Sequence, residues 1–234
     1  MVRKLQTIAF DADDTLWHNE RFFRLTQDRF LELLADHAEA EALEARLTEA
    51  ERRNLGQYGF GVKGFVLSMI ETAVEVTDGR VPGHVIGELL AVGRDMLAHP
   101  IELLPHAQDA VERLAGTHHL VLITKGDLLH QERKLAQSGL GEMFERVEIV
   151  SDKKAPVYST IFAGCPGGAV GAMMVGNSMK SDVRPAIDAG AWGVFVPHEL
   201  EWAFEAADPP EAPRFREIDH LGQLPGLVDR IEQI

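Results

Sequence analysis

Residues 7–15 read Thr7-Ile8-Ala9-Phe10-Asp11-Ala12-Asp13-Asp14-Thr15. The apolar run ends abruptly in acidic residues, which is typical of a short buried strand that leads into a loop. Asp11 and Asp13 are two positions apart on extended backbone, so their side chains are expected to project to the same side. Two neighbouring carboxylates repel each other, which raises one pKa, and a bound cation relieves that repulsion. Taken alone, however, a pair of aspartates is also typical of a solvated turn.

Four further candidate strands follow in the second half of the chain, at residues 120–123, 147–150, 172–175 and 193–196. Segments with helical spacing separate them, and two of these segments end near Gly139 and Gly190, residues suited to closing a helix. Alternating strands and helices build a parallel sheet with helices on both faces. The sequence therefore predicts an α/β, Rossmann-like core.

Residues 18–102 contain no comparable strand and show helical spacing instead, for example at Phe65, Met69, Ile70, Ala73 and Val74. The acid- and arginine-rich stretch 39–53 is interpreted as an exposed helix. We expect two domains: an α/β core made of residues 1–17 and 103–234, and an all-α insertion made of residues 18–102. Gly59-Phe60-Gly61-Val62-Lys63-Gly64 has the spacing of a dinucleotide-binding loop, but no strand precedes it, so a tight turn between helices is the better interpretation.

Composition limits the classes of function. With 234 residues and 45% hydrophobic content, the chain can bury a full core without metal or disulfide support. A formal net charge of −14 argues against broad contact with nucleic acid or an anionic membrane. The single cysteine and the lack of any long apolar stretch favour a cytoplasmic protein. A small phosphorylated metabolite remains compatible with this charge, because a metal ion and a few lysines can make a pocket locally positive.

Polar residues follow three of the predicted strands, where ligands bind in open parallel sheets. The first strand ends in Asp11-Ala12-Asp13, the second in Thr124-Lys125-Gly126-Asp127, and the fourth in Gly176-Asn177-Ser178. These strand ends are expected to meet at one edge of the sheet. Their convergence carries more weight than any single motif.

These motifs, in this order, resemble those of the haloacid dehalogenase superfamily. Residues 11–15 resemble its DxDxT signature, Thr124 its phosphate-binding residue, Lys153 its motif lysine, and residues 175–182 its acidic fourth motif. The resemblance covers residues 8 to about 197, and the helical insertion after the first motif resembles the superfamily's cap subclass. It implies a Rossmann-like core with a helical cap.

The resemblance also implies a mechanism, that of a phosphatase. Asp11 would attack phosphorus and form an aspartyl-phosphate, while Asp13 would protonate the leaving alcohol and then take a proton from water. Thr124 and Lys125 would bind the phosphate, and Lys153 would neutralise its charge. The spacing to Tyr158 favours Lys153 as the motif lysine, although the adjacent Lys154 is an alternative.

Magnesium is the cofactor that the resemblance implies, held by Asp11, Asp13, Asn177 and Asp182. Asn177 stands where an aspartate is usual in the family, and an amide oxygen can bind a metal but lacks charge. Asp182 is therefore expected to supply the missing negative charge, directly or through a water. Asp182 could equally be the N-cap of the helix that ends before Gly190.

Three alternative functions remain open. A haloacid dehalogenase would use Asp11 but has no need of Asp13 to protonate an alcohol. A phosphomutase shares all the core residues, and a catalytically silent binding protein could keep the fold. The sequence does not identify the substrate, and it leaves open a monomer or a homodimer.

Overall fold

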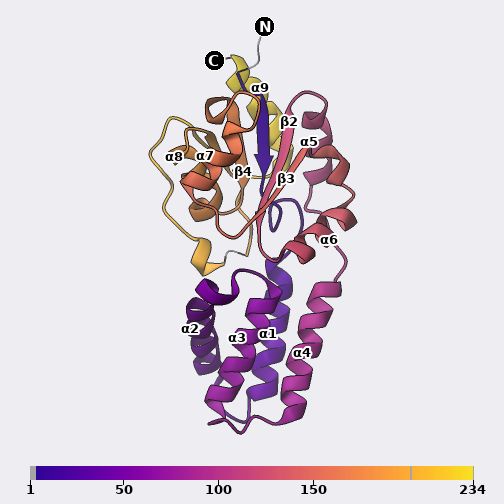
Figure 1. The fold of residues 1–234 in the computed structure, drawn as a ribbon, viewed down its shortest axis with the longest axis vertical. Coiled ribbons are helices and arrows are strands. Elements are labelled where there is room, and N and C mark those ends of the chain that lie inside the picture. The colour runs from indigo at the N-terminus through magenta and orange to yellow at the C-terminus, as the bar shows by residue number, and fades with distance from the viewer. Residues whose placement is uncertain (1–3, 201, 234) are drawn as a thin grey trace. The chain divides into compact units, whose positions relative to one another are not determined.

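The computed structural model describes residues 4–200 and 202–233 (Figure 1). This part of the chain divides into two compact units. The first unit runs up to Glu20 and includes Ile101–Lys125 and the chain from Gln131 onward. The second unit comprises Arg21–Pro100 and the short segment Gly126–His130.

Within the described residues, six parallel strands form one sheet in the order β3-β2-β1-β4-β5-β6. Their bounds are β1 Thr7–Phe10, β2 His119–Lys125, β3 Arg146–Val150, β4 Ala172–Gly176, β5 Trp192–Phe195 and β6 Phe215–Glu217. All five strands expected from the sequence are present, and a short sixth strand extends the sheet at one edge. The predicted α/β, Rossmann-like core is confirmed.

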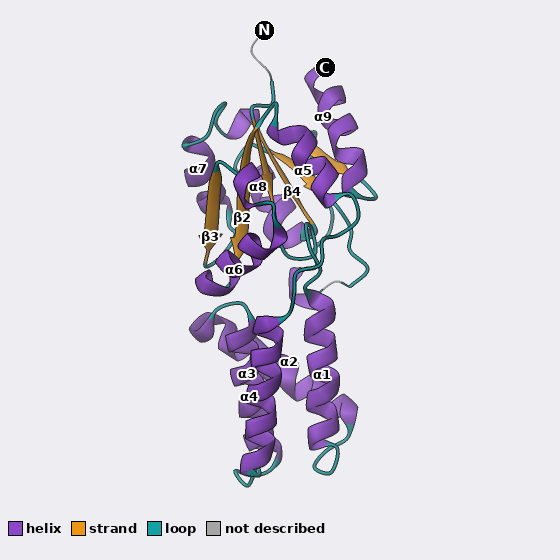
Figure 2. Cartoon of the chain, turned by 90° about the vertical axis from the view of Figure 1, so that its right-hand side faces the viewer, coloured by secondary structure: helices purple, strands orange, loops and turns teal. Residues whose placement is uncertain are grey.

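Helices cover both faces of this sheet, as the strands' apolar side chains require (Figure 2). Ile8 and Phe10 of β1 join one apolar cluster with side chains from α5 and α9, whereas Ala9 joins a second cluster with side chains from α7 and α8. Alternate residues of a strand point to opposite faces, so buried residues on every position need cover on both sides. The bounds are α5 Ala107–Ala115, α6 Leu128–Ser138, α7 Ala155–Ala163, α8 Arg184–Asp188 and α9 Leu224–Gln233.

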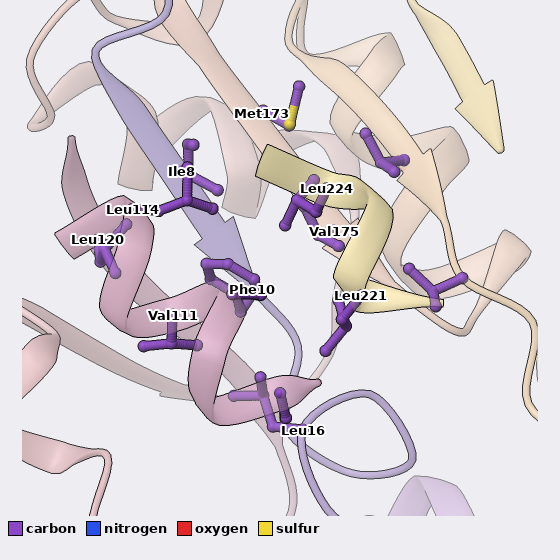
Figure 3. Packing of buried hydrophobic residues seen from close by; sticks show 14 of the residues in the cluster. Ile8, Phe10, Leu16, Val111, Leu114, Leu120, Met173, Val175, Leu221 and Leu224 are labelled. Atoms are coloured by element: carbon purple, nitrogen blue, oxygen red, sulfur yellow. The ribbon is translucent and has the colours of Figure 1, made fainter. Parts of the chain in front are cut away.

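The larger of these clusters holds the sheet to its helices (Figure 3). Phe10 and Val175 of neighbouring strands lie against Val111 of α5 and Leu224 near the start of α9. Each fully buried side chain of this kind stabilises the fold by about 1.5–3 kcal/mol. Short helical turns complete the unit: 3₁₀ turns at Gly141–Met143, Ala169–Gly171, Ala203–Glu205 and Leu221–Gln223, and a π-helical turn at Met179–Val183.

Helices α1 to α4 carry the core of the second unit. Their bounds are α1 Glu20–Leu34, α2 Ala40–Tyr58, α3 Val62–Val76 and α4 Gly83–Ala98. The helix expected at residues 39–53 is present as α2 and is mostly exposed, but it also buries Leu43, Leu47, Ala50 and Asn54 along one face. The frequent charges of this segment concealed an apolar stripe at helical spacing.

The glycine-rich segment at residues 59–64 forms the turn between α2 and α3 with its first three residues, and its last three begin α3. Gly59 and Gly61 adopt positive φ angles of 73° and 113°, which side chains rarely tolerate. A Cβ atom on Gly64 would lie 2.9 Å from the Gly59 carbonyl oxygen. The interpretation as a tight turn is therefore confirmed. None of the helices that the structure describes is long and apolar enough to cross a membrane.

Candidate active site

The expected site residues gather where the parallel strands end. Asp11 follows β1 directly, Thr124 lies at the end of β2, and Asn177 follows β4. Strand β1 pairs with β2 on one side and with β4 on the other, so these three ends share one edge. The direction in which strands are added reverses between β1 and β4, which is the point where open parallel sheets bind ligands.

A buried lysine links two aspartates at this edge. The Nζ atom of Lys153 donates to Asp11 Oδ1 at 2.5 Å and to Asp182 Oδ1 at 2.7 Å. The Lys153 side chain is only 1% exposed, so its ammonium group contacts the two carboxylates in place of water. Its neighbour Lys154 is exposed and pairs instead with Asp152. Of the two lysines that the sequence left open, Lys153 is the one that reaches Asp11.

Burial controls the protonation of Asp11. Removal from water, assisted by the nearby charge of Asp182, raises the pKa of Asp11 to about 7, although Lys153 opposes the shift. Burial acts against the charged form of Lys153 as well, but the two carboxylates outweigh it and raise the pKa of the ammonium. Asp11 is therefore mostly ionised only above neutral pH, whereas Lys153 stays charged.

Asp13 lies among three donors. Its Oδ1 atom accepts from Trp17 Nε1 at 2.7 Å and from Lys134 Nζ at 2.6 Å, and its Oδ2 atom accepts from Gln131 Nε2 at 2.9 Å. Burial alone would raise the pKa of Asp13, but the charge of Lys134 and these hydrogen bonds lower it below its ordinary value. In this arrangement Asp13 is a carboxylate.

Sequence reasoning missed the role of α6 in this site. Gln131 and Lys134 are three residues apart, so they share one face of the helix. Both are buried, which is unusual for these residue types. Their spacing in the first helix after Thr124 was the available signal. The structure also places the Trp17 indole nitrogen on Asp13.

Hydrogen bonds also connect the first, second and fourth motifs. The Thr15 hydroxyl donates to Asn177 Oδ1 at 3.1 Å and accepts from the Asn177 backbone amide at 3.0 Å. Thr124 is 1% exposed, and its hydroxyl accepts from Gln131 Nε2 at 3.2 Å. The structure thus brings Thr124 and Asp13 to the same donor, and it ties Asn177 to the first loop.

Lys125 makes an ion pair that the sequence did not suggest. Its ammonium contacts the Glu205 carboxylate and donates to Ser181 Oγ at 2.9 Å. Glu205 also accepts from Ser178 Oγ at 2.5 Å. Burial opposes ionisation of Glu205, yet the charge of Lys125 and these donors lower its pKa. No sequence signal marks Glu205, because it lies in a long connection after β5 whose path depends on tertiary packing.

Asp182 is completely buried, and both of its oxygens have partners. Oδ1 accepts from Lys153, and Oδ2 accepts from the Ser178 backbone amide at 3.0 Å. Gly176 makes room for it, since a Cβ atom there would lie 2.2 Å from Asp182 Oδ2. Asp182 is not the N-cap of α8; Ser178 caps the π-helical turn by accepting from the Ser181 amide. The expected metal contact of Asp182 stays a prediction.

The oxygen atoms near Asp11 fit a magnesium ion in type. Asp11 and Asn177 offer a carboxylate and an amide oxygen, and the Asp13 backbone offers a carbonyl, all hard donors of the kind that Mg²⁺ prefers. Lys153 occupies Asp11 Oδ1, which leaves Oδ2 available. No cluster of three or more acidic, histidine or cysteine side chains suited to a metal occurs among the described residues. Binding of Mg²⁺ at this site would therefore depend on few negatively charged ligands.

A parallel sheet with an aspartate pair, a buried lysine and a buried threonine at its ligand-binding edge places the protein in the Rossmann-like α/β class. The family model for haloacid dehalogenase-like hydrolases matches residues 5–190. The crystal structure of a haloacid dehalogenase-like family hydrolase from Xanthomonas campestris is 36% identical, covers 99% of this chain and 93% of its own, and has a TM-score of 0.89. This chain belongs to the haloacid dehalogenase-like hydrolase family.

More distant structures share the fold. The proposed HAD-hydrolase YfnB from Bacillus subtilis, bound to magnesium, is 18% identical, with 97% of this chain and 100% of that chain covered and a TM-score of 0.66. L-2-haloacid dehalogenase from Xanthobacter autotrophicus is also 18% identical, with 96% and 98% covered and a TM-score of 0.66. No curated protein shows significant similarity to the chain.

Proposed function

We propose that this protein is a magnesium-dependent phosphatase that hydrolyses a small phosphomonoester through an aspartyl-phosphate on Asp11. The observation that carries the proposal is the second aspartate, Asp13, which lies in a network of donors beside the Thr124 hydroxyl. Cleavage of a phosphate ester requires a proton for the departing alcohol, and Asp13 can deliver it. Displacement of a halide ion requires no such proton.

Each side chain then has a task in phosphoryl transfer. Asp11 attacks phosphorus, and the hydrogen bond from Lys153 holds its carboxylate in place. Lys153 and the Thr124 hydroxyl offset the charge on the phosphate oxygens. Asp182 keeps Lys153 in place from the opposite side. The raised pKa of Asp11 makes the nucleophile most available above neutral pH.

Magnesium would be held by Asp11, the Asp13 carbonyl and Asn177, with Asp182 as an outer contributor. A bound ion would supply positive charge that offsets the negative charge of the phosphate. Lys125 would approach the phosphate from the second strand, with Glu205 as its counterion. The magnesium-bound relative from Bacillus subtilis supports this choice of ion.

We further propose that residues 18–102 act as a cap domain on a core made of residues 1–17 and 103–234. Helical insertions of this kind restrict entry and exclude water from the reaction. A small phosphorylated metabolite suits such an enclosure better than a macromolecule. The formal charge of −14 supports the same conclusion, since a nucleic acid or anionic membrane would be repelled.

A haloacid dehalogenase is the second candidate. Asn177 favours it, because an amide in place of a carboxylate weakens the attraction for a divalent cation. Release of halide from a 2-halo acid, lost in Asp11→Asn, would establish this activity. Asp13, with its three donors, counts against it.

The test of the proposal is phosphate release from p-nitrophenyl phosphate and from a panel of metabolite phosphates, with and without Mg²⁺. We expect magnesium-dependent release that Asp11→Asn abolishes. Asp229→Asn is a matched control, because it makes the same chemical change at an exposed position of α9. Absence of release from every substrate would contradict the proposal.

A further inference from the structure

The two oxygens of the Asp13 carboxylate have different surroundings. Oδ1 accepts two strong hydrogen bonds, from Trp17 Nε1 at 2.7 Å and from the Lys134 ammonium at 2.6 Å. Within the described part of the chain, Oδ2 accepts one, from Gln131 Nε2 at 2.9 Å. The Lys134 side chain is 6% exposed, so water competes little for its charge. Oδ1 is therefore anchored, whereas Oδ2 depends on a single neutral donor.

That donor is shared. Gln131 Nε2 lies 2.8 Å from the Lys125 carbonyl oxygen, 2.9 Å from Asp13 Oδ2 and 3.2 Å from Thr124 Oγ1. An amide nitrogen has two hydrogens, so it cannot serve three acceptors fully at one time. Gln131 is buried, and its Oε1 atom has no hydrogen-bond partner among the described residues. Gln131 can therefore change which of these three acceptors its amide hydrogens bind.

We propose that Trp17, Lys134 and Gln131 are positioning residues for Asp13, which fix Oδ1 and leave Oδ2 as the oxygen that exchanges the proton. The inference rests on the proposed phosphatase function. Trp17 and Lys134 hold the carboxylate in place, and Gln131 can move its hydrogen from Asp13 Oδ2 to Thr124 Oγ1. When Thr124 donates its own hydrogen to a bound phosphate, its oxygen becomes a better acceptor, because donating and accepting reinforce each other. Phosphate binding thereby frees Oδ2.

The proton balance over one turnover follows. Asp13 starts as a carboxylate, so Oδ2 first takes a proton from solvent after Gln131 has released it. Oδ2 gives this proton to the ester oxygen as the phosphorus–oxygen bond breaks and the bond from Asp11 to phosphorus forms. Oδ2 then takes a proton from the water whose oxygen attacks the aspartyl-phosphate. Inorganic phosphate leaves, Asp11 is regenerated, and Asp13 returns the proton to solvent when Gln131 donates to Oδ2 again. Lys134 and Trp17 stay on Oδ1 in both steps and transfer nothing.

The test compares two substrates that differ in their need for a proton, p-nitrophenyl phosphate and phenyl phosphate. The nitrophenolate leaves readily as an anion, whereas phenolate is more basic and benefits from protonation. The quantity measured is kcat/KM, which reports the steps up to formation of the aspartyl-phosphate. The variants are Gln131→Leu, Lys134→Met and Lys134→Arg. Gln137→Leu is the matched control on the exposed face of α6.

We expect Gln131→Leu and Lys134→Met to lower kcat/KM for phenyl phosphate by about tenfold or more, and for p-nitrophenyl phosphate by less than about threefold. Lys134→Arg restores much of the loss on phenyl phosphate, because a guanidinium can also donate to Oδ1. Gln137→Leu changes neither value. Circular dichroism checks that each variant is folded. If Lys134→Met does not fold, Gln131→Leu still provides the test.

Equal losses on the two substrates, or no loss on either, would overturn this inference while the native protein still releases phosphate. That pattern would mean that α6 stabilises the site without directing the proton. If the native protein and Gln137→Leu release phosphate from neither substrate nor from the metabolite panel, the proposed function itself fails. The two failures are therefore distinguishable.

Discussion

At the scale of single residues, the site concentrates charge where water is excluded. Lys153 lies between Asp11 and Asp182, so one buried cation faces two carboxylates. An unbalanced buried negative charge destabilises a fold, and here it falls on Asp11, the residue assigned to the reaction. The raised pKa of Asp11 reflects the free energy needed to ionise this buried carboxyl group. The charge that the proposed reaction requires on Asp11 therefore lowers the stability of the fold.

The first prediction concerns Asp11→Asn in the absence of metal. The folded state holds the Asp11 proton up to about pH 7, whereas the unfolded chain releases it near its ordinary value of 3.8. Asp11 therefore lowers the stability progressively as the pH rises between these two values, and by its full amount above pH 7. We expect Asp11→Asn to increase the free energy of unfolding at pH 8 by about 4 kcal/mol, and much less at pH 4.

Urea unfolding at a series of pH values, with a chelator present, measures this difference. Asp229→Asn serves as the control, because its exposed surface pair with Arg113 contributes little. A variant that is less stable than the native protein at pH 8 would contradict the account of Asp11.

The second prediction concerns Asn177. Replacing its amide with a carboxylate adds a full negative charge to the oxygens that face the first loop, while Thr15 can still donate to the new side chain. We expect Asn177→Asp to lower the Mg²⁺ concentration required for half-saturation by about tenfold. Titration calorimetry with Mg²⁺ alone measures the affinity without any substrate. An unchanged affinity would show that residue 177 does not face the ion.

At the scale of elements, two glycines of α4 test how α3 and α4 pack. A Cβ atom on Gly93 would lie 2.5 Å from Val66 Cγ2, whereas nothing lies within 4 Å of one on Gly87. We expect Gly93→Ala to destabilise the protein by about 1–3 kcal/mol through overpacking. Gly87→Ala should stabilise it by about 0.5–1 kcal/mol, because alanine favours the helix. Thermal unfolding of both variants checks this pair, and the same sign for both would refute the packing.

Elements differed in how far the sequence predicted them. Strand β1 was clear because apolar residues 7–10 end in acidic residues, and the centre of β2 and most of β4 are similarly apolar. Strand β6 was not among the predicted strands, because Phe215–Glu217 is short and carries charged residues at an edge. Helix α2 concealed its apolar stripe among charges. A strand can thus be predicted from its local sequence pattern, whereas the burial of a helix face depends on tertiary contacts.

The same distinction applies to the site. Asp11, Thr124 and Asn177 could be predicted because strand ends of a parallel sheet converge at one edge. Lys153 was less certain, since burial separates it from Lys154 and burial is not visible in a Lys-Lys pair. The contact of Glu205 with Lys125 was not predictable, because the two residues are 80 positions apart in the sequence and Glu205 lies in an irregular connection.

At the scale of the whole molecule, the net charge of −14 sets which partners can approach. We predict no binding to duplex DNA or to anionic lipid vesicles at low salt, where attraction between opposite charges would be strongest. Gel shift and vesicle sedimentation measure the two cases. Binding that weakens as salt is added would reveal a basic face that the total charge conceals.

The central claim is that phosphorus becomes bonded to Asp11. Native protein mixed with a hydrolysed phosphomonoester and Mg²⁺ is quenched in acid during turnover, digested, and analysed by mass spectrometry for the peptide that contains Asp11. The account predicts one phosphoryl group on Asp11 in the native protein and none in Asp11→Asn. Steady phosphate release with no phosphoryl group on Asp11 at any quench time, or a phosphoryl group on another residue, would contradict it.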